Sequence, residues 1–255
     1  MSNRLRQRYY RARQRLLITG ENPVVIIGSA HKVGSTWLAN LLSTLYQYPL
    51  LAMKPPADAN SLPVDTPLED LVDQFRQMSG SGIHKTHAFP LSSVPNELQP
   101  RLKFVTIVRD PRDILVSAAH YLAQLEPALG GWGAEFAALS IKQRVLAIIE
   151  RGDFILDRLD AWYNFHGVFV CRYEDLSTDV MPALEDLSGK LGLPYSNKRA
   201  ERAVNAASFQ KMSGRESGEE SQASFFRNGI VGDWKSVFDQ EMLEILAEAK
   251  SGRWS

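Results

Sequence analysis

The sequence predicts a single α/β domain, in which a central and mainly parallel β-sheet carries helices on both faces. The 255 residues suffice for one large domain, and no repeat or linker divides them, so we expect it to span residues 1–255. Short apolar runs at residues 24–27, 104–108 and 167–171 are each followed by a helical pattern. Strands that alternate with helices in this way are typical of a parallel sheet.

The first of these units joins a buried strand to a helix through a glycine-containing turn. Residues 24–27 are apolar throughout, as a strand covered on both faces requires. Residues 28–33 form the turn, and Gly34 opens a helix whose apolar positions recur at helical spacing. The first N–H groups of a helix lack partners within it and carry partial positive charge, so they bind phosphate or sulfate readily.

Polar groups at this turn favour a P-loop-like site for an anion. Ser35 and Thr36 add hydroxyl donors, and Lys32 adds a full positive charge. The spacing is not that of an ordinary ATPase, because a Walker A lysine follows the second glycine, whereas Lys32 precedes Gly34. A purely structural turn is the alternative.

A lysine and a histidine come together in the next extended segment, residues 83–87 (Ile-His-Lys-Thr-His). Alternate side chains of a strand point to the same face, so we expect Lys85 and His87 to lie side by side. That arrangement places a cation beside a possible general base. A structural role for the histidine is the alternative.

The second buried strand, residues 104–108, leads directly into a helix. Pro111 suits the first turn of that helix, which we expect from about Asp113, and Ser117 then lies about one turn inside it. Arg109 stands at the end of the strand, where ligands collect in parallel sheets, and its guanidinium can hold a phosphate bidentately. The alternative is a surface ion pair with one of the two aspartates that follow.

The rest of the chain predicts a third strand, a further helix and two loops. The strand is expected over residues 167–171 and the helix over residues 179–191. Prolines break up residues 49–66. Residues 213–222 are small and polar, which is typical of a lid or of a segment without fixed structure.

A fourth candidate binding segment is residues 225–235. Arg227, Asn228 and Gly229 offer a guanidinium, an amide and an open backbone N–H. A turn anchored by its aromatic residues is the alternative explanation.

The charge balance argues against one class of partner but not against small anions. Lys and Arg total 29, as do Asp and Glu, so the net charge is zero, whereas nucleic-acid binders usually carry a basic excess. The first 15 residues contain six arginines and no acidic residue. We expect residues 1–20 to form a basic helical extension, with contact to anionic lipid, nucleic acid or an acidic partner as the alternative.

The single cysteine and the apolar pattern limit the remaining classes. Cys171 excludes an internal disulfide and a zinc site built from several cysteines, and its apolar neighbours indicate a buried thiol. No apolar run approaches the roughly 18 residues of a membrane span. The N-terminus lacks the apolar core of a signal peptide, so we expect a cytoplasmic protein.

In order and spacing, these segments resemble the cytosolic sulfotransferase family. Its members transfer a sulfuryl group from 3'-phosphoadenosine 5'-phosphosulfate (PAPS) and release 3'-phosphoadenosine 5'-phosphate (PAP). The resemblance runs from about residue 24 to residue 235. Residues 31–37 are similar to the family's phosphosulfate loop, residues 85–87 to its Lys-Thr-His segment, and Arg109 with Ser117 to its Arg and Ser eight residues apart. Residues 173–176 are similar to its Tyr-Glu-Asp-Leu stretch, and residues 208–212 to its Ser-Phe-x-x-Met segment. Residues 227–235 are similar to its motif of Arg-Lys-Gly followed by Gly-Asp-Trp-Lys.

The resemblance implies a PAPS-dependent sulfotransferase that needs no metal and acts by in-line displacement. It makes His87 the general base, acting as a neutral imidazole near its ordinary pKa, and gives Lys32 and Lys85 the task of stabilising charge on the transferred group. The implied donor-binding residues are Lys32, Gly34, Ser35, Thr36 and Trp37 for the 5'-phosphosulfate, Arg109, Ser117, Arg227, Asn228 and Gly229 for the 3'-phosphate, and Trp37, Tyr173 and Phe209 around adenine.

The chain departs from the family pattern at several positions. His31 stands where the family has proline, Val33 where it has a small residue, and Asn228 where it has lysine. Ala207 replaces a threonine that contacts adenine. Residues 239–240 (Asp-Gln) replace the apolar centre of the family's dimer motif, so we do not expect the usual dimer and leave the oligomeric state open.

The acceptor is expected to be a small molecule of secondary metabolism, by analogy with the family. A hydroxyl acceptor is favoured over an amine. We expect loops at residues 49–66, 124–140 and 213–222 to form the acceptor pocket.

Two other functions stay open at this point. A P-loop-type nucleotide kinase would need a lysine after the second glycine, and that lysine is missing. A non-catalytic nucleotide-binding protein would keep the pocket, but the presence of Lys32, Lys85 and His87 argues against lost catalysis.

Overall fold

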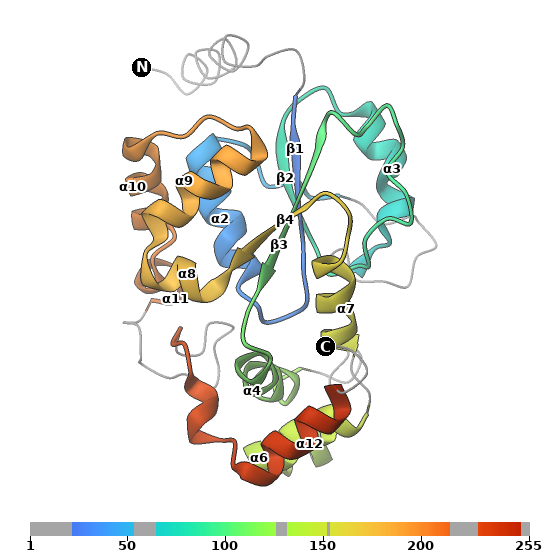
Figure 1. Ribbon diagram of the computed structural model, residues 1–255, viewed down its shortest axis with the longest axis vertical. Coiled ribbons are helices and arrows are strands. Elements are labelled where there is room, and N and C mark those ends of the chain that lie inside the picture. The colour runs from blue at the N-terminus through green and yellow to red at the C-terminus, as the bar shows by residue number, and fades with distance from the viewer. Residues whose placement is uncertain (1–21, 54–64, 126–131, 152–153, 215–228, 251–255) are drawn as a thin grey trace.

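The structure, a computed structural model, describes residues 22–53, 65–125, 132–151, 154–214 and 229–250 (Figure 1). The strands are β1 (Val24–Gly28), β2 (Gly82–Thr86), β3 (Leu102–Val108) and β4 (Val168–Arg172). The helices are α2 (Ser35–Tyr46), α3 (Leu68–Gln77), α4 (Pro111–Leu122), α5 (Gly133–Ala138), α6 (Ile141–Glu150), α7 (Phe154–Tyr163), α8 (Tyr173–Thr178), α9 (Val180–Leu191), α10 (Asn197–Ala206), α11 (Phe209–Ser213), the 3-10 helix η3 (Asp233–Ser236) and α12 (Gln240–Lys250).

Several expectations fall outside these residues. The basic extension at residues 1–20 is one, and Arg227 and Asn228 are others. Of the expected loop at residues 213–222, only the first two positions are described.

The described strands form one parallel sheet in the order β2-β1-β3-β4. The three expected strands and the extended Lys-Thr-His segment are confirmed to within one or two residues of their predicted bounds. Because all the strands run in the same direction, their carboxyl ends meet at one edge. The turn after β1, Arg109 and Tyr173 therefore leave the sheet at the same edge as His87.

Helices cover both faces of the sheet, as the sequence predicts. In Figure 1, α2, α8, α9 and α10 lie on one side of the strands, and α3 and α7 lie on the other. Strand β1 is buried throughout: Val25 and Ile27 join the core beneath α2, whereas Val24 and Ile26 join a second core with Phe75. This double burial explains why the strand is apolar at every position.

Helix α4 begins two residues earlier than the expected start at Asp113. Pro111 occupies its first turn, and the side chain of Asp110 caps the helix by accepting a hydrogen bond from the N–H of Arg112. An aspartate cap followed by proline is a strong start signal, and it places the helix directly after Arg109.

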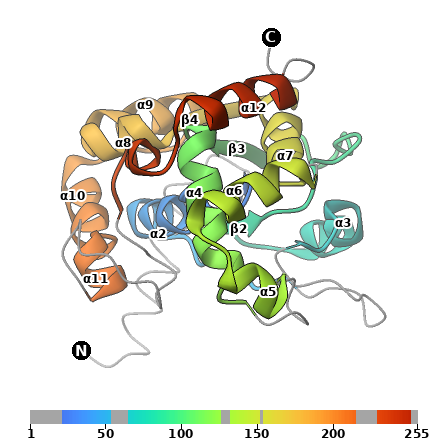
Figure 2. The same cartoon turned by 90° about the horizontal axis from the view of Figure 1, so that it is seen from below.

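A further layer of helices lies beyond the carboxyl edge of the sheet. Figure 2 looks toward this edge, with α4 and α6 in front of the strands. The segment 124–140, expected to be an acceptor loop, contains the short helix α5, so that expectation was wrong in part. The apolar pattern did not predict this helix, because Phe136 is its only buried side chain and one position gives no periodicity. Phe136 packs against Trp132.

The single cysteine lies in the core of the protein. Cys171 is buried at 7% exposure, and burial raises the pKa of its thiol to about 12, as expected for an unreactive core cysteine. None of the helices within the described ranges combines the length and the apolar character that crossing a bilayer requires.

Candidate functional site

The turn between β1 and α2 has a strained backbone. Lys32 has a φ of 65° and Gly34 a φ of 97°. A left-handed conformation costs a non-glycine residue about 1–2 kcal/mol. Arg109 holds the strained turn, because its Nη1 donates to the carbonyl of Lys32 over 3.3 Å. Strain that is fixed by surrounding contacts is typical of functional sites.

The amino end of α2 presents backbone N–H groups that no helical carbonyl reaches. The N–H of Leu38 donates to the carbonyl of Gly34, so the N–H groups of residues 35–37 precede the helical pattern. No side chain caps this end. A Cβ on Gly34 would lie 2.7 Å from the ring of Tyr173, so only glycine fits there. This helix end has the geometry of the predicted anion site.

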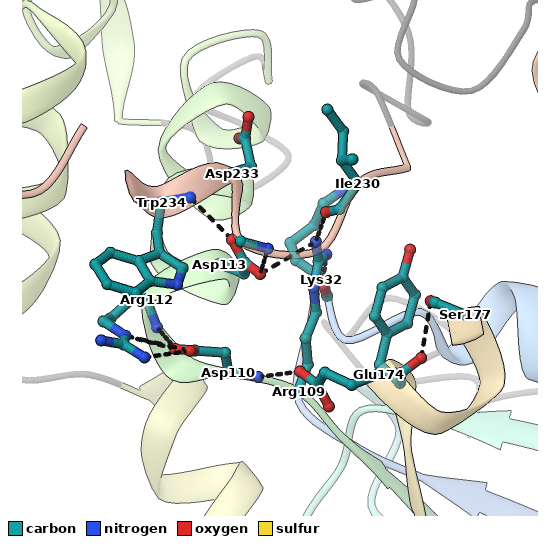
Figure 3. Close-up of polar contacts among 12 residues, drawn as sticks. Lys32, Arg109, Asp110, Arg112, Asp113, Glu174, Ser177, Ile230, Asp233 and Trp234 are labelled. Atoms are coloured by element: carbon teal, nitrogen blue, oxygen red, sulfur yellow. Dashed lines mark hydrogen bonds and ion pairs between the residues drawn. The ribbon is translucent and has the colours of Figure 1, made fainter. Parts of the chain in front are cut away.

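Arg109 reaches from the end of β3 to a segment far away in the sequence (Figure 3). Its Nη2 donates to the carbonyl of Ile230 over 3.0 Å, and its guanidinium lies 4.4 Å from the ring centroid of Tyr173. Its Nε is buried without a hydrogen-bonding partner among the described residues. The ion pair with Asp113 that the sequence left open exists at 4.0 Å, but it is buried rather than at the surface.

Asp113 is a site residue to which the sequence assigned no role in binding. Its buried carboxylate accepts hydrogen bonds from the backbone N–H groups of Gly232, at 2.8 Å, and Trp234, at 3.0 Å (Figure 3). The carboxylate therefore ties the segment that carries Gly229 to the first turn of α4. The only local signal was an acid in the first turn of a helix, which is too common to indicate this role.

One face of α4 looks toward the turn after β1. Asp113, Ser117 and Tyr121 recur every four residues and so share that face. The Nζ of Lys32 lies 4.3 Å from the ring centroid of Tyr121, and Asp113 lies beside Arg109. Ser117 is half-buried between these two contacts. The structure thus brings Ser117 to the same edge as the two cations, as the sequence predicts.

The three aromatic residues assigned to adenine lie near this edge in two groups. Trp37 and Tyr173 pack edge to face with ring centroids 5.6 Å apart. Phe209 lies against Gly229, where φ is 67° and a Cβ would lie 2.7 Å from the phenyl ring. The next residue, Ile230, accepts from Arg109, which connects the two groups.

His87 lies just beyond the end of β2 with both ring nitrogens engaged. Its Nδ1 is 3.0 Å from the carbonyl of Ser29, and its Nε2 is 3.3 Å from the Nζ of Lys85. Since a carbonyl can only accept, Nδ1 carries the proton and Nε2 has the lone pair. The expected pairing of Lys85 and His87 is therefore present, with Nε2 as the basic atom.

The surroundings of His87 keep its imidazole neutral. Burial holds its pKa well below the usual range, and the charges of His31 and Lys85 act in the same direction. The Ser29 carbonyl and Asp65 oppose this shift. The sequence expectation of a base near its ordinary pKa was therefore wrong. Burial lowers the pKa of Lys85 as well, against the charge of Asp65.

The structure thus assembles two adjoining parts of one site. A cationic part contains Lys32, Arg109 and the end of α2, and a basic part contains Lys85 and His87. The turn after β1 joins them, because its Ser29 contacts His87. Such a site can hold a small anion with several charges and remove a proton beside it. Within the described ranges, no group of three or more His, Cys, Asp or Glu side chains could hold a metal ion.

Comparison with known proteins gives one result for nearly the whole chain. A family model described as the sulfotransferase domain matches residues 22–250. Flavonol 3-sulfotransferase of Flaveria bidentis is 29% identical over 247 residues, covering 86% of this chain and 78% of the relative. Cytosolic sulfotransferase 8 of Arabidopsis thaliana is 26% identical over 257 residues, covering 89% of this chain and 76% of the relative.

A solved structure gives the same result for the fold. Mouse sulfotransferase SULT7A1 complexed with PAP has a TM-score of 0.63 and 19% sequence identity, covering 91% of this chain and 84% of that chain.

Proposed function

The chain belongs to the sulfotransferase domain family, and we propose that it moves a sulfuryl group from PAPS to a hydroxyl of a small-molecule acceptor. The observation that carries this proposal is the pairing of His87 with Lys85 at the end of β2, beside the turn that holds Lys32. A base and two ammonium groups at one edge of a sheet suit the transfer of an anionic group to a nucleophile.

The described residues fit the two phosphate groups of PAPS. The unpartnered Nε of Arg109 and the N–H groups at the end of α2 are donors that an anion would satisfy. Residues 34–37 would hold the 5'-phosphate through their N–H groups. Arg109, Ser117 and Gly229 would hold the 3'-phosphate. The proposed neighbours of adenine are Trp37, Tyr173 and Phe209.

His87 is the proposed general base. PAPS supplies the sulfuryl group, and the acceptor oxygen displaces the bridging oxygen of the PAP leaving group in line. The Nε2 of His87 takes the proton of the acceptor hydroxyl as that oxygen attacks. The hydrogen bond to Ser29 keeps the proton on Nδ1, so Nε2 keeps its lone pair and takes the acceptor proton as the ammonium of Lys85 turns from it to the sulfuryl oxygens. The low pKa keeps the base form populated at cellular pH, at the cost of some basicity.

Lys32 and Lys85 are proposed to stabilise negative charge as it moves. Lys32 would act on the oxygen that leaves with PAP, and Lys85 on the sulfuryl oxygens. Both ammonium groups are held in place before the reaction, Lys85 by His87 and Lys32 over the ring of Tyr121. Cations fixed where charge develops stabilise the transition state more than the bound substrate.

The acceptor class and the location complete the proposal. Phe89 follows His87 by two residues and is 50% exposed, which suits contact with an apolar acceptor. The name of the flavonol relative supports a small hydroxyl-bearing acceptor rather than an amine. The name of the Arabidopsis relative supports a cytoplasmic location.

The test starts with a panel of phenols, alcohols and amines incubated with PAPS, with products read by mass. For the sulfated acceptor, His87→Ala should lower kcat by about 100-fold or more, the usual scale of general base catalysis. PAP should still bind the variant, because His87 is not assigned to the donor. His166→Ala, an exposed histidine before β4, is the matched control and should keep full activity. Near-normal turnover of His87→Ala would remove the base assignment.

A further inference from the structure

A second imidazole lies against the base. The rings of His31 and His87 have centroids 3.9 Å apart and planes 34° apart. Rings stacked in this way exchange no hydrogen bond, so His31 does not relay a proton to His87 through this contact. It instead covers one face of the His87 ring.

His31 is itself anchored by charged side chains from two other parts of the chain. Its Nε2 lies 3.5 Å from Oδ1 of Asp65, and Nη2 of Arg158 lies 3.7 Å from the same oxygen. Asp65 precedes α3, and Arg158 belongs to α7. All three side chains are at most 22% exposed, so solvent screens these interactions only in part.

We propose that His31, anchored by Asp65, is a positioning residue that fixes the imidazole of His87 for proton abstraction. The proposal rests on the proposed function, because it gives His87 the task of a base. It goes beyond the family resemblance, since the family has proline at this position and a proline ring offers Asp65 no hydrogen-bond donor.

The charges around His87 give the proposal a measurable consequence. Lys85 faces it from β2, His31 from the turn after β1, and Asp65 from the segment before α3, while Arg158 of α7 pairs with the same Asp65 oxygen as His31. Burial lowers the pKa of His87 most, and the charges of His31 and Lys85 lower it further. Replacing His31 by phenylalanine removes its contribution and should therefore raise the pKa of His87.

The decisive variant is His31→Phe, which keeps a ring against His87 but loses the contact with Asp65. NMR titration of labelled histidines, with His87 assigned by its loss in His87→Ala, should show the pKa of His87 rising above its value in the unmodified protein. The acid limb of kcat/KM should move upward by the same amount. If His31 only supported folding, its replacement would change the stability of the protein but would move neither the acid limb of kcat/KM nor the pKa of His87.

A double-mutant cycle tests the anchoring by Asp65. His31→Phe and Asp65→Asn should each lower kcat at the high-pH plateau by roughly tenfold, because the base is less well oriented. The KM for PAPS should not change. The double variant should lose no more than the worse single variant, since both changes break the same contact.

Clear outcomes would overturn the proposal. An unchanged pKa of His87 in His31→Phe is one, and additive losses in the cycle are another. The control His166→Phe should alter neither measurement. If His31→Phe does not fold, as judged by circular dichroism, His31→Gln supports the same titration. If the unmodified protein transferred no sulfuryl group, the proposed function would be wrong. The titration would still report whether His31 acts on His87.

Discussion

Two histidines in the β2 segment differ in role because side chains alternate along a strand. His87 faces the site with Lys85, whereas His84 packs edge-on against Phe75 with ring centroids 5.7 Å apart. Burial, followed by the charge of Lys85, lowers the pKa of His84 from 6.5 to about 4. The sequence placed Lys85 and His87 on one face correctly, but the burial of His84 depends on α3, which it did not predict.

The low pKa of His84 should make stability depend on pH. The folded protein binds this proton less readily than the unfolded chain, so stability is full above pH 6.5 and declines toward pH 4. The loss over this window is about 3 kcal/mol. In urea unfolding at pH 7 and pH 4.5, His84→Leu should lose correspondingly less stability on acidification. An equal loss in both proteins would assign the effect to other groups.

A side chain at Gly34 would meet both left-handed backbone strain and close packing, and a second glycine separates the two effects. A Cβ at Gly34 would meet Tyr173, whereas Gly167, with a φ of 78°, has nothing within 4 Å of its Cβ position. Alanine at either position should cost about 1–2 kcal/mol of stability through left-handed strain. Only Gly34→Ala should weaken PAP binding, by roughly tenfold or more. Isothermal calorimetry would measure the affinity for PAP. Equal affinities of Gly34→Ala and Gly167→Ala would mean that the amino end of α2 tolerates a side chain at Gly34.

Helix α4 organises the site at the scale of elements. The sequence predicted Pro111 in its first turn, because helix starts depend on local residues, but it did not predict the cap at Asp110 and placed the start two residues late. Its partners could not be predicted, because Asp113 bonds backbone groups of Gly232 and Trp234, which lie 119 and 121 residues further along the chain. Contacts at that separation leave no mark in local periodicity.

Asp113→Ala should therefore loosen the segment after Gly229 from α4. Two N–H groups would lose their acceptor, which should cost about 2–3 kcal/mol of stability and weaken PAP binding. Asp113→Asn keeps one oxygen acceptor and should lose less. Asp186→Asn, at an exposed pair with Lys190, is the control and should change little. If proteolysis of the segment after Gly229 were as slow in Asp113→Ala as in the unmodified protein, Asp113 would not be what holds this segment to α4.

At the scale of the whole molecule, a chain of zero net charge concentrates cations at one edge of its sheet. Lys32, Lys85 and Arg109 come from three separate segments, and the parallel strand order brings them together. The total charge therefore says nothing about affinity for a small anion.

Thermal unfolding with ligands tests this convergence. PAP at about 100 times its Kd should add about 2.7 kcal/mol, which raises Tm by about 5–10 °C in a domain of this size. Arg109→Ala should reduce the shift with PAP far more than the shift with adenosine 5'-phosphosulfate, which lacks the 3'-phosphate. Arg76→Ala, an exposed arginine on α3, should leave both shifts intact. An equal or larger shift with ATP would favour the kinase alternative.

The sequence by itself determined the strands, the glycine-containing turn after β1 and the pairing of Lys85 with His87, because buried runs, helix starts and strand alternation are local properties. It also carried the family resemblance. Only the tertiary structure decided that His31 stacks on His87, that Asp65 pairs with both His31 and Arg158, and that Asp113 holds the segment after Gly229. These contacts join separate parts of the fold, and burial, which shifts the pKa of His87, exists only once those parts have packed.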